Sequence, residues 1–184
     1  MWPKDSCRQE TPRYSRAVNK PAAVAALATL PLLLPATASA KPGVCQRTTI
    51  QAVLVQENRL TPEGVANGRK VSLVRCGDVT DDGNADALFA VASGGTAGNT
   101  RFGVIEGRKN GSPGALVLYK RGYGVGVSRR DRRSFEVLQP HYRAEDPNCC
   151  PSSYRLTRYT WSGNGFSAGK AKKLSRAPRR FYRP

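Results

Sequence analysis

The chain of 184 residues carries 30 Lys and Arg, 13 Asp and Glu and one histidine, which gives a formal net charge of +17 at pH 7. The single histidine, His141, and the absence of a nucleophile-elbow or zinc motif disfavour a hydrolase, since a Ser/His/Asp set would have to come from residues that no motif marks. The surplus of positive charge predicts binding to polyanions.

The first 40 residues have the pattern of an export signal. Five basic residues precede an apolar run at residues 22–36, and the sequence A-S-A at residues 38–40 matches a cleavage site. We therefore expect cleavage after residue 40 and a secreted, extracellular or cell-wall associated protein. An uncleaved anchor is the alternative, which two prolines in the apolar run disfavour. The start is either Met1 or Val18. A start at Val18 would give a signal of conventional length.

The remaining 144 residues have the size of a single domain with a hydrophobic core. They carry 25 Lys and Arg against 11 Asp and Glu, a net charge of +14. We expect one globular domain over residues 41–169. Residues 170–184 contain seven basic residues and no acid, which predicts a disordered basic tail.

The pattern of apolar residues predicts an α+β fold that is mainly antiparallel β, in a small disulfide-containing domain with one short N-terminal helix. Residues 48–60 fit either a short helix or a strand, and the helix is favoured. Strands are predicted at residues 71–74, 87–92, 101–106, 115–120, 135–138 and 154–161, joined by turns rich in Gly, Asn and Pro.

An acidic loop joins the first two predicted strands, with the sequence C-G-D-V-T-D-D-G-N-A-D at residues 76–86. Oxygen-bearing residues alternate with others around a glycine at the sixth place, as in loops that bind calcium. The repulsion between four acids within nine positions also favours a bound cation. The alternative is a plain acidic turn. The predicted calcium ligands are Asp78, Thr80, Asp82, Asn84 and Asp86.

This loop resembles the calcium loop of FG-GAP or VCBS-type repeats, whose pattern is roughly G-D-x-[ND]-G-D-G-x-x-D. Five residues match the pattern, while Thr80 and Asp81 depart from it; the matching residues are Gly77, Asp78, Asp82, Gly83 and Asp86. The resemblance implies a calcium ion in the loop. It covers about twenty residues and does not extend to a propeller, because the motif occurs once.

Glycine occupies every second position of residues 122–126, which leaves one strand face open to backbone, an aromatic ring or a ligand. Residues 129–133 follow as a charged hairpin tip, either a solvated turn or a polyanion contact. Together with the tail they supply the predicted polyanion-binding residues, namely Arg129, Arg130, Arg132, Arg133, Lys170, Lys172, Lys173, Arg176, Arg179 and Arg180.

Four cysteines follow the predicted cleavage site: Cys45, Cys76, Cys149 and Cys150. An even number in an exported chain predicts two disulfides. A bond between the adjacent Cys149 and Cys150 would close a strained ring, so we expect each of them to pair with Cys45 or Cys76. A redox role for the adjacent pair is disfavoured because it is not a C-x-x-C motif.

Four motifs in this order resemble small exported proteins and lipoproteins of high-GC Gram-positive bacteria, of the mycobacterial LppP/LprE type. The motifs are the acidic loop, G-G-T-A-G, D-P-N-C-C-P and Y-x-W-S-G-N-G-F, within residues 70–166. The resemblance implies an exported protein but no defined activity. Residues 42–44 do not form a lipobox before Cys45, so a lipid anchor is not implied.

The sequence thus favours an exported, non-catalytic domain whose basic surface binds an anionic polymer of the cell envelope. The alternative is a secreted interaction or inhibitor module that contacts a protein through its Gly-rich and aromatic hairpins. Specific nucleic-acid binding and a transmembrane span after cleavage are not expected.

Overall fold

A computed structural model of the protein describes residues 43–183. The predicted export signal, its cleavage site and the choice of start lie outside the described residues. The fold is mainly antiparallel β with two helices and one disulfide, which confirms the predicted fold class.

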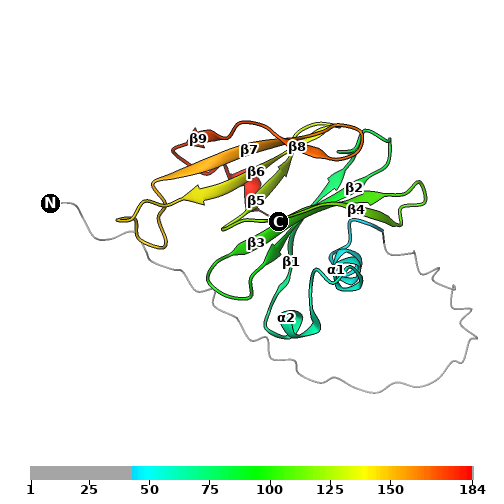
Figure 1. Ribbon diagram of the computed structural model, residues 1–184, viewed down its shortest axis with the longest axis horizontal. Coiled ribbons are helices and arrows are strands. Elements are labelled where there is room, and N and C mark those ends of the chain that lie inside the picture. The colour runs from blue at the N-terminus through cyan, green and yellow to red at the C-terminus, as the bar shows by residue number, and fades with distance from the viewer. Residues whose placement is uncertain (1–42, 184) are drawn as a thin grey trace, which may run out of the picture. The chain divides into compact units, whose positions relative to one another are not determined.

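Sheet A contains four antiparallel strands in the order β1-β2-β3-β4 (Figure 1). Their bounds are β1 Lys70–Gly77, β2 Asp86–Ala92, β3 Asn99–Gly107 and β4 Pro113–Arg121. The sequence of β2 is apolar after its first residue because both faces of the strand are buried. Phe89 and Val91 face the helical side, whereas Leu88 and Ala90 face the second sheet.

The helical side of sheet A is covered by α1 (Arg47–Gln56), with α2 (Pro62–Ala66) following it (Figure 1). Ile50 and Leu54, one helical turn apart, are fully buried and join the cluster of apolar residues beneath α1. Thr61 caps α2 by accepting a hydrogen bond from the Gly64 amide at 3.1 Å. The favoured helix within residues 48–60 is therefore confirmed, and α2 was not predicted.

Sheet B is antiparallel and packs against the opposite face of sheet A. Its strands are β5 Gly126–Arg129, β6 Ser134–His141, β7 Ser153–Trp161, β8 Phe166–Ala168 and β9 Lys172–Leu174. β6 pairs with one edge of β7, while β8 and β9 pair with different parts of its other edge. The core between the sheets includes Phe102 from sheet A and Phe135 and Tyr159 from sheet B. The rings of Phe135 and Tyr159 stack with centroids 5.1 Å apart.

The C-terminal segment is ordered, so the prediction of a disordered tail is wrong for residues 170–183. It forms β9 and then a 3₁₀ turn, η1 (Arg179–Phe181), whose Phe181 is fully buried. Phe181 lies over Gly126, where an added Cβ would come within 2.7 Å of the Phe181 Cβ. The alternating glycines therefore admit an aromatic residue from this segment, and burial of one ring offsets the repulsion among its basic residues.

We expect Phe181→Ala to lower the free energy of unfolding by about 3 kcal/mol, the usual cost of truncating a buried phenylalanine. Urea denaturation measures this loss, and hydrogen exchange should show faster exchange at residues 172–174. The control is Tyr182→Phe, which removes only the hydroxyl that donates to the Gly124 carbonyl and should cost about 1 kcal/mol. Equal losses in the two variants would contradict burial of Phe181 as the main attachment.

Candidate functional site

The acidic loop between β1 and β2 is organised around the carboxylate of Asp86, which is fully buried. One of its oxygens accepts hydrogen bonds from the Val79 amide at 2.8 Å, the Thr80 amide at 3.0 Å and the Thr80 hydroxyl at 3.0 Å. The other oxygen accepts from the Gly107 amide at 3.0 Å. Asp86 thus supplies acceptors for backbone groups of the loop and of the neighbouring strand β3.

The side chains of the other predicted calcium ligands also form hydrogen bonds within the loop. Asp78 accepts from the Asp81 amide at 2.7 Å and the Gly83 amide at 3.1 Å, and Asp82 accepts from the amide and side chain of Asn84. Within residues 43–183, no three acidic, His or Cys side chains are placed to hold a metal ion. Calcium binding by the loop therefore stays a prediction.

Arginines of the β5–β6 hairpin contact the acidic loop and supply positive charge to it. Arg132 lies 3.3 Å from the carboxylate of Asp78 and 3.6 Å from that of Asp81, and Arg133 also lies 3.6 Å from Asp81. From the sequence, the carboxylates were predicted to belong to a calcium site and the arginines to a separate polyanion-binding surface. The structure joins the two, so part of the repulsion within the loop is relieved by cations of the same chain.

A second ionic cluster lies on the outer face of sheet B around Glu136, which is only 5 % exposed. Its carboxylate lies 3.1 Å from Arg130, 3.0 Å from Arg180 and 3.9 Å from Arg158. Arg180 belongs to the C-terminal segment, so this contact ties the segment to the sheet. Sequence reasoning missed Glu136 and Arg158 because they stand in ordinary strand positions and no motif marks them.

The ten predicted polyanion-binding residues therefore divide into two groups. Arg130, Arg132, Arg133 and Arg180 form ion pairs within the domain. In the part of the chain that the structure describes, the other six pair with no carboxylate; they are Arg129, Lys170, Lys172, Lys173, Arg176 and Arg179, and all are exposed. A hollow of about 530 Å³ at the β5–β6 hairpin is lined by charged residues of both signs, which are Arg132, Arg133, Arg158, Asp81 and Asp131.

Pairing of β9 with β7 places two cations directly opposite each other. Lys173 is the cross-strand partner of Arg155, and both residues are exposed. Like charges in this position destabilise a sheet unless an anion lies between them. Arg155 was not among the predicted binding residues, because the sequence alone does not reveal that a strand of the tail lies against it.

The disulfide pairing differs from the one expected. Cys45 is bonded to Cys76, which links the start of α1 to β1. Cys149 and Cys150 are exposed in the connection between β6 and β7, and their sulfur atoms lie 2.7 Å apart. Pairing of either residue with Cys45 or Cys76 is therefore wrong, because those two cysteines already lie beside each other across the start of the domain.

An aromatic patch lies at the turn before β5, where the sequence places Tyr123 between two glycines. Tyr123 is 46 % exposed, and its ring packs edge-on against Tyr142 with centroids 5.9 Å apart. Burial, with Tyr154 and Tyr142 nearby, raises the pKa of Tyr182 to about 12. Its hydroxyl is therefore protonated at neutral pH and donates to the Gly124 carbonyl at 2.9 Å.

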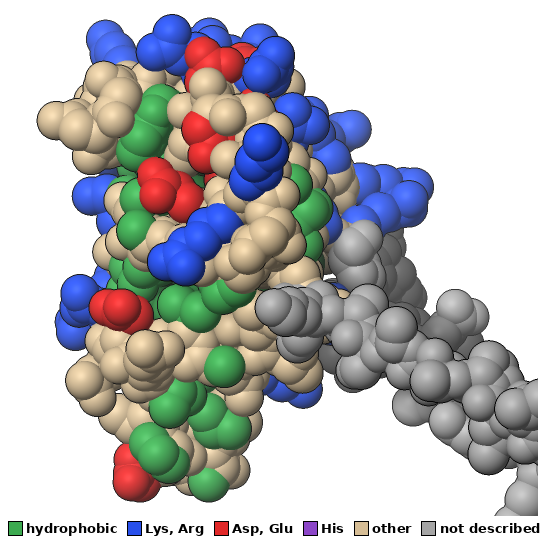
Figure 2. Space-filling model, turned by 90° about the vertical axis from the view of Figure 1, so that its right-hand side faces the viewer, with side chains coloured by type: hydrophobic (Ala, Val, Ile, Leu, Met, Phe, Trp, Pro, Cys, Tyr) green, Lys and Arg blue, Asp and Glu red, His purple; other side chains and the backbone are tan. Residues whose placement is uncertain are grey.

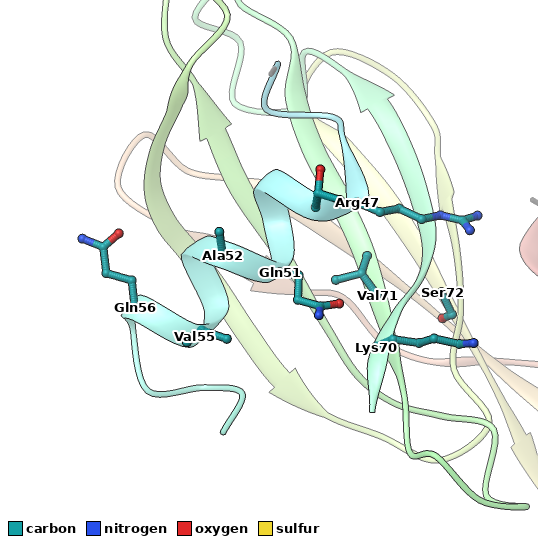
Figure 3. A pocket seen from close by; sticks show the side chains of 9 residues that line it. Arg47, Gln51, Ala52, Val55, Gln56, Lys70, Val71 and Ser72 are labelled. Carbon is teal, nitrogen blue, oxygen red and sulfur yellow. The ribbon is translucent and has the colours of Figure 1, made fainter. Parts of the chain in front are cut away.

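A groove of about 870 Å³ lies between α1 and the edge strand β1 (Figure 3). Val71 and Ala52 contribute apolar surface, and Arg47 and Lys70 extend to the same side of the groove (Figure 3). Among the described residues that line it there is no acidic, histidine or cysteine side chain, and its polar side chains include Thr48, Lys70 and Ser72. His141 lies elsewhere, exposed at the end of β6.

Comparisons with known proteins give no information about the site. No family model matches the chain, and no curated protein or solved structure matches it significantly. Among residues 43–183, none of the helices is long and apolar enough to cross a membrane.

Proposed function

We propose that the protein is an exported, non-catalytic domain that binds an anionic polymer of the cell envelope through strands β7 and β9 of sheet B and the C-terminal segment. The distribution of charge supports this proposal. Residues 126–183 contain fourteen Lys and Arg against four acids, whereas residues 43–125 contain ten against seven. Figure 2 shows Lys and Arg gathered along the upper part of the visible face, the side on which sheet B lies.

The observation that carries the proposal is the cross-strand pair of cations on β7 and β9. Arg155 and Lys173 are direct cross-strand partners, whereas Lys172, the next residue on β9, projects to the other face of the sheet. None of the three has a carboxylate partner among the described residues. Strand pairing fixes their backbones, so less conformational freedom is lost on binding than in a disordered tail. A polymer of regularly spaced anions would relieve the repulsion between them.

The test is binding to heparin and to purified teichoic acid at several salt concentrations. We expect the triple variant Arg155→Gln, Lys172→Gln, Lys173→Gln to bind about tenfold more weakly, and the slope of log K against log salt to fall by about two to three. The matched control removes three exposed cations of sheet A and its β3–β4 turn, through Arg108→Gln, Lys109→Gln and Lys120→Gln. Equal weakening in both variants would mean that net charge alone governs binding, and the proposed surface would be wrong.

A secreted interaction module is the second candidate, and the exposed Tyr123 packed on Tyr142 is the observation that favours it. Aromatic side chains of this kind are enriched at protein interfaces. In the same experiment with isolated cell envelope, a protein contact would persist at high salt, whereas polyanion binding would be lost. The predicted calcium loop and the LppP/LprE resemblance are compatible with both polyanion binding and a protein-interaction module, so they do not distinguish the two candidates.

A further inference from the structure

We propose that the groove between α1 and β1 binds a fatty-acid-like anion, with its acyl chain along the helix and its carboxylate beside Arg47 and Lys70. The groove has a volume of about 870 Å³, which lies within the range of small-molecule binding sites. Its lining residues belong to α1 and β1, so it shares no residue with β7 or β9. The inference is therefore independent of polymer binding by sheet B.

The side of α1 that lines the groove is more apolar than a helix covering one face of a sheet requires. Ile50 and Leu54 already bury the helix against sheet A, and both are fully buried. Ala52 and Val55 form a second apolar strip on a different side of the helix. Val55 is 38 % exposed, and a ligand with an apolar chain would remove this surface from water.

The strand β1 contributes one apolar side chain to the groove. Val71 is only 3 % exposed and belongs to the same apolar cluster as Ile50 and Leu54, so the groove is continuous with the hydrophobic core beneath α1. Between residues 48 and 55 the helix rises by about 10 Å. The apolar strip is therefore long enough for a single acyl chain of medium length.

Two cations lie beside the apolar strip. Arg47, the first residue of α1, and Lys70, the first residue of β1, extend to the same side of the groove (Figure 3). Within residues 43–183 neither pairs with a carboxylate, and neither the groove lining nor the first turn of α1 contains an acid. This charge favours a ligand with an anionic head, and a guanidinium group binds a carboxylate through two parallel hydrogen bonds.

Two other occupants of the groove are disfavoured by the same region. A second copy of the chain in a two-fold dimer would bring its own Arg47 and Lys70 against this pair, and like charges repel. An added peptide strand would have to pair with β1 where its register shifts between Val71 and Leu73, and such an irregularity disrupts pairing at a sheet edge. A single-chain anionic amphiphile requires neither contact.

The test titrates the isotope-labelled full chain with decanoate and follows the backbone amides by NMR. We expect saturable binding with a dissociation constant of about 1 mM or below, because an open groove gives a small ligand modest affinity. The shifts should be confined to residues 47–56 and 70–72. Acetate has the head without the chain, and decyltrimethylammonium has the opposite charge on the same chain, so each should bind about tenfold more weakly than decanoate.

Substitutions test the two parts of the groove separately. Arg47→Gln with Lys70→Gln removes the cations and should weaken decanoate binding about tenfold. Val55→Glu places a carboxylate beside the acyl chain and should weaken binding at least as much. The matched control, Arg108→Gln with Lys109→Gln, removes two exposed cations from the β3–β4 turn and should leave binding unchanged. Thermal melts establish that each variant folds, which the exposure of these positions leads us to expect.

Several results would overturn the proposal. Equal affinity for decanoate and decyltrimethylammonium would mean that the cations do not select the head group. Equal weakening in the control pair would mean that net charge governs binding. The absence of saturable shifts at residues 47–56, or a dimer formed through the groove in sedimentation experiments, would also contradict it. The variant Arg155→Gln, Lys172→Gln, Lys173→Gln should bind decanoate as the wild type does, which separates this groove from the polymer-binding strands.

Discussion

Substitution of Asp86 by alanine is expected to lower the free energy of unfolding by about 5 kcal/mol. The buried carboxylate accepts four hydrogen bonds, from three backbone amides and the Thr80 hydroxyl. Its removal leaves these donors buried without an acceptor, at a cost of about 1–3 kcal/mol each, although such costs are not fully additive. Urea denaturation measures the loss. If Asp86→Ala does not fold, Asp86→Asn, whose amide group cannot accept in place of one oxygen, should lose about half as much.

The control for Asp86 is Asp82→Ala in the same loop. Asp82 is exposed and accepts only from the amide and side chain of Asn84, so its loss should cost less than about 1 kcal/mol. Both variants are measured in millimolar calcium and in chelator. If the hydrogen bonds to Asp86 alone hold the loop, each protein has the same free energy of unfolding in calcium and in chelator. The alternative result is that calcium raises the stability of the wild type but not that of Asp82→Ala. This result would support the predicted cation site, because an ion bound only by the folded state stabilises that state.

Removal of the disulfide by Cys45→Ser and Cys76→Ser is expected to lower the free energy of unfolding by about 4 kcal/mol. The two residues are 31 positions apart, and the chain-entropy relation gives this value for a loop of that length. The bond also holds the start of α1 beside the end of β1, so helical circular dichroism should decrease before the sheets unfold. Denaturation of the oxidised proteins in urea measures the change.

The matched control is the double variant Cys149→Ser, Cys150→Ser. These exposed residues enclose no chain between them, so a bond between them constrains the unfolded state very little, and we expect a change within about 0.5 kcal/mol. A loss as large as that of the first double variant would contradict the disulfide pairing found here and favour the crossed pairing expected from the sequence.

Local pattern determined much of the fold. The apolar run at residues 87–92 predicted a buried strand because continuous burial on two faces leaves a continuous apolar sequence, and β2 occupies that segment. The apolar positions 50 and 54 favoured a helix because they are one turn apart, and both are buried in α1. The alternating glycines likewise predicted a strand face open to close approach, which Phe181 occupies.

Long-range contacts were beyond the sequence. Disulfide pairing depends on which cysteines meet in space: the structure joins Cys45 to Cys76, whereas the sequence favoured a bond from each of them to Cys149 or Cys150. The basic segment after residue 170 has the composition of a disordered tail, yet one buried ring and the ion pair of Arg180 with Glu136 attach it to sheet B. Neither contact leaves a local signal.

For the candidate site, the sequence by itself determined that the protein is strongly basic and that an acidic loop joins its first two strands. Only the tertiary structure decided that Asp86 turns inward to accept backbone hydrogen bonds and that Arg132 and Arg133 lie against the loop. The physical reason is that charge and periodicity are properties of composition and local order. The partner of each charge depends instead on how distant strands pair and which faces they bury.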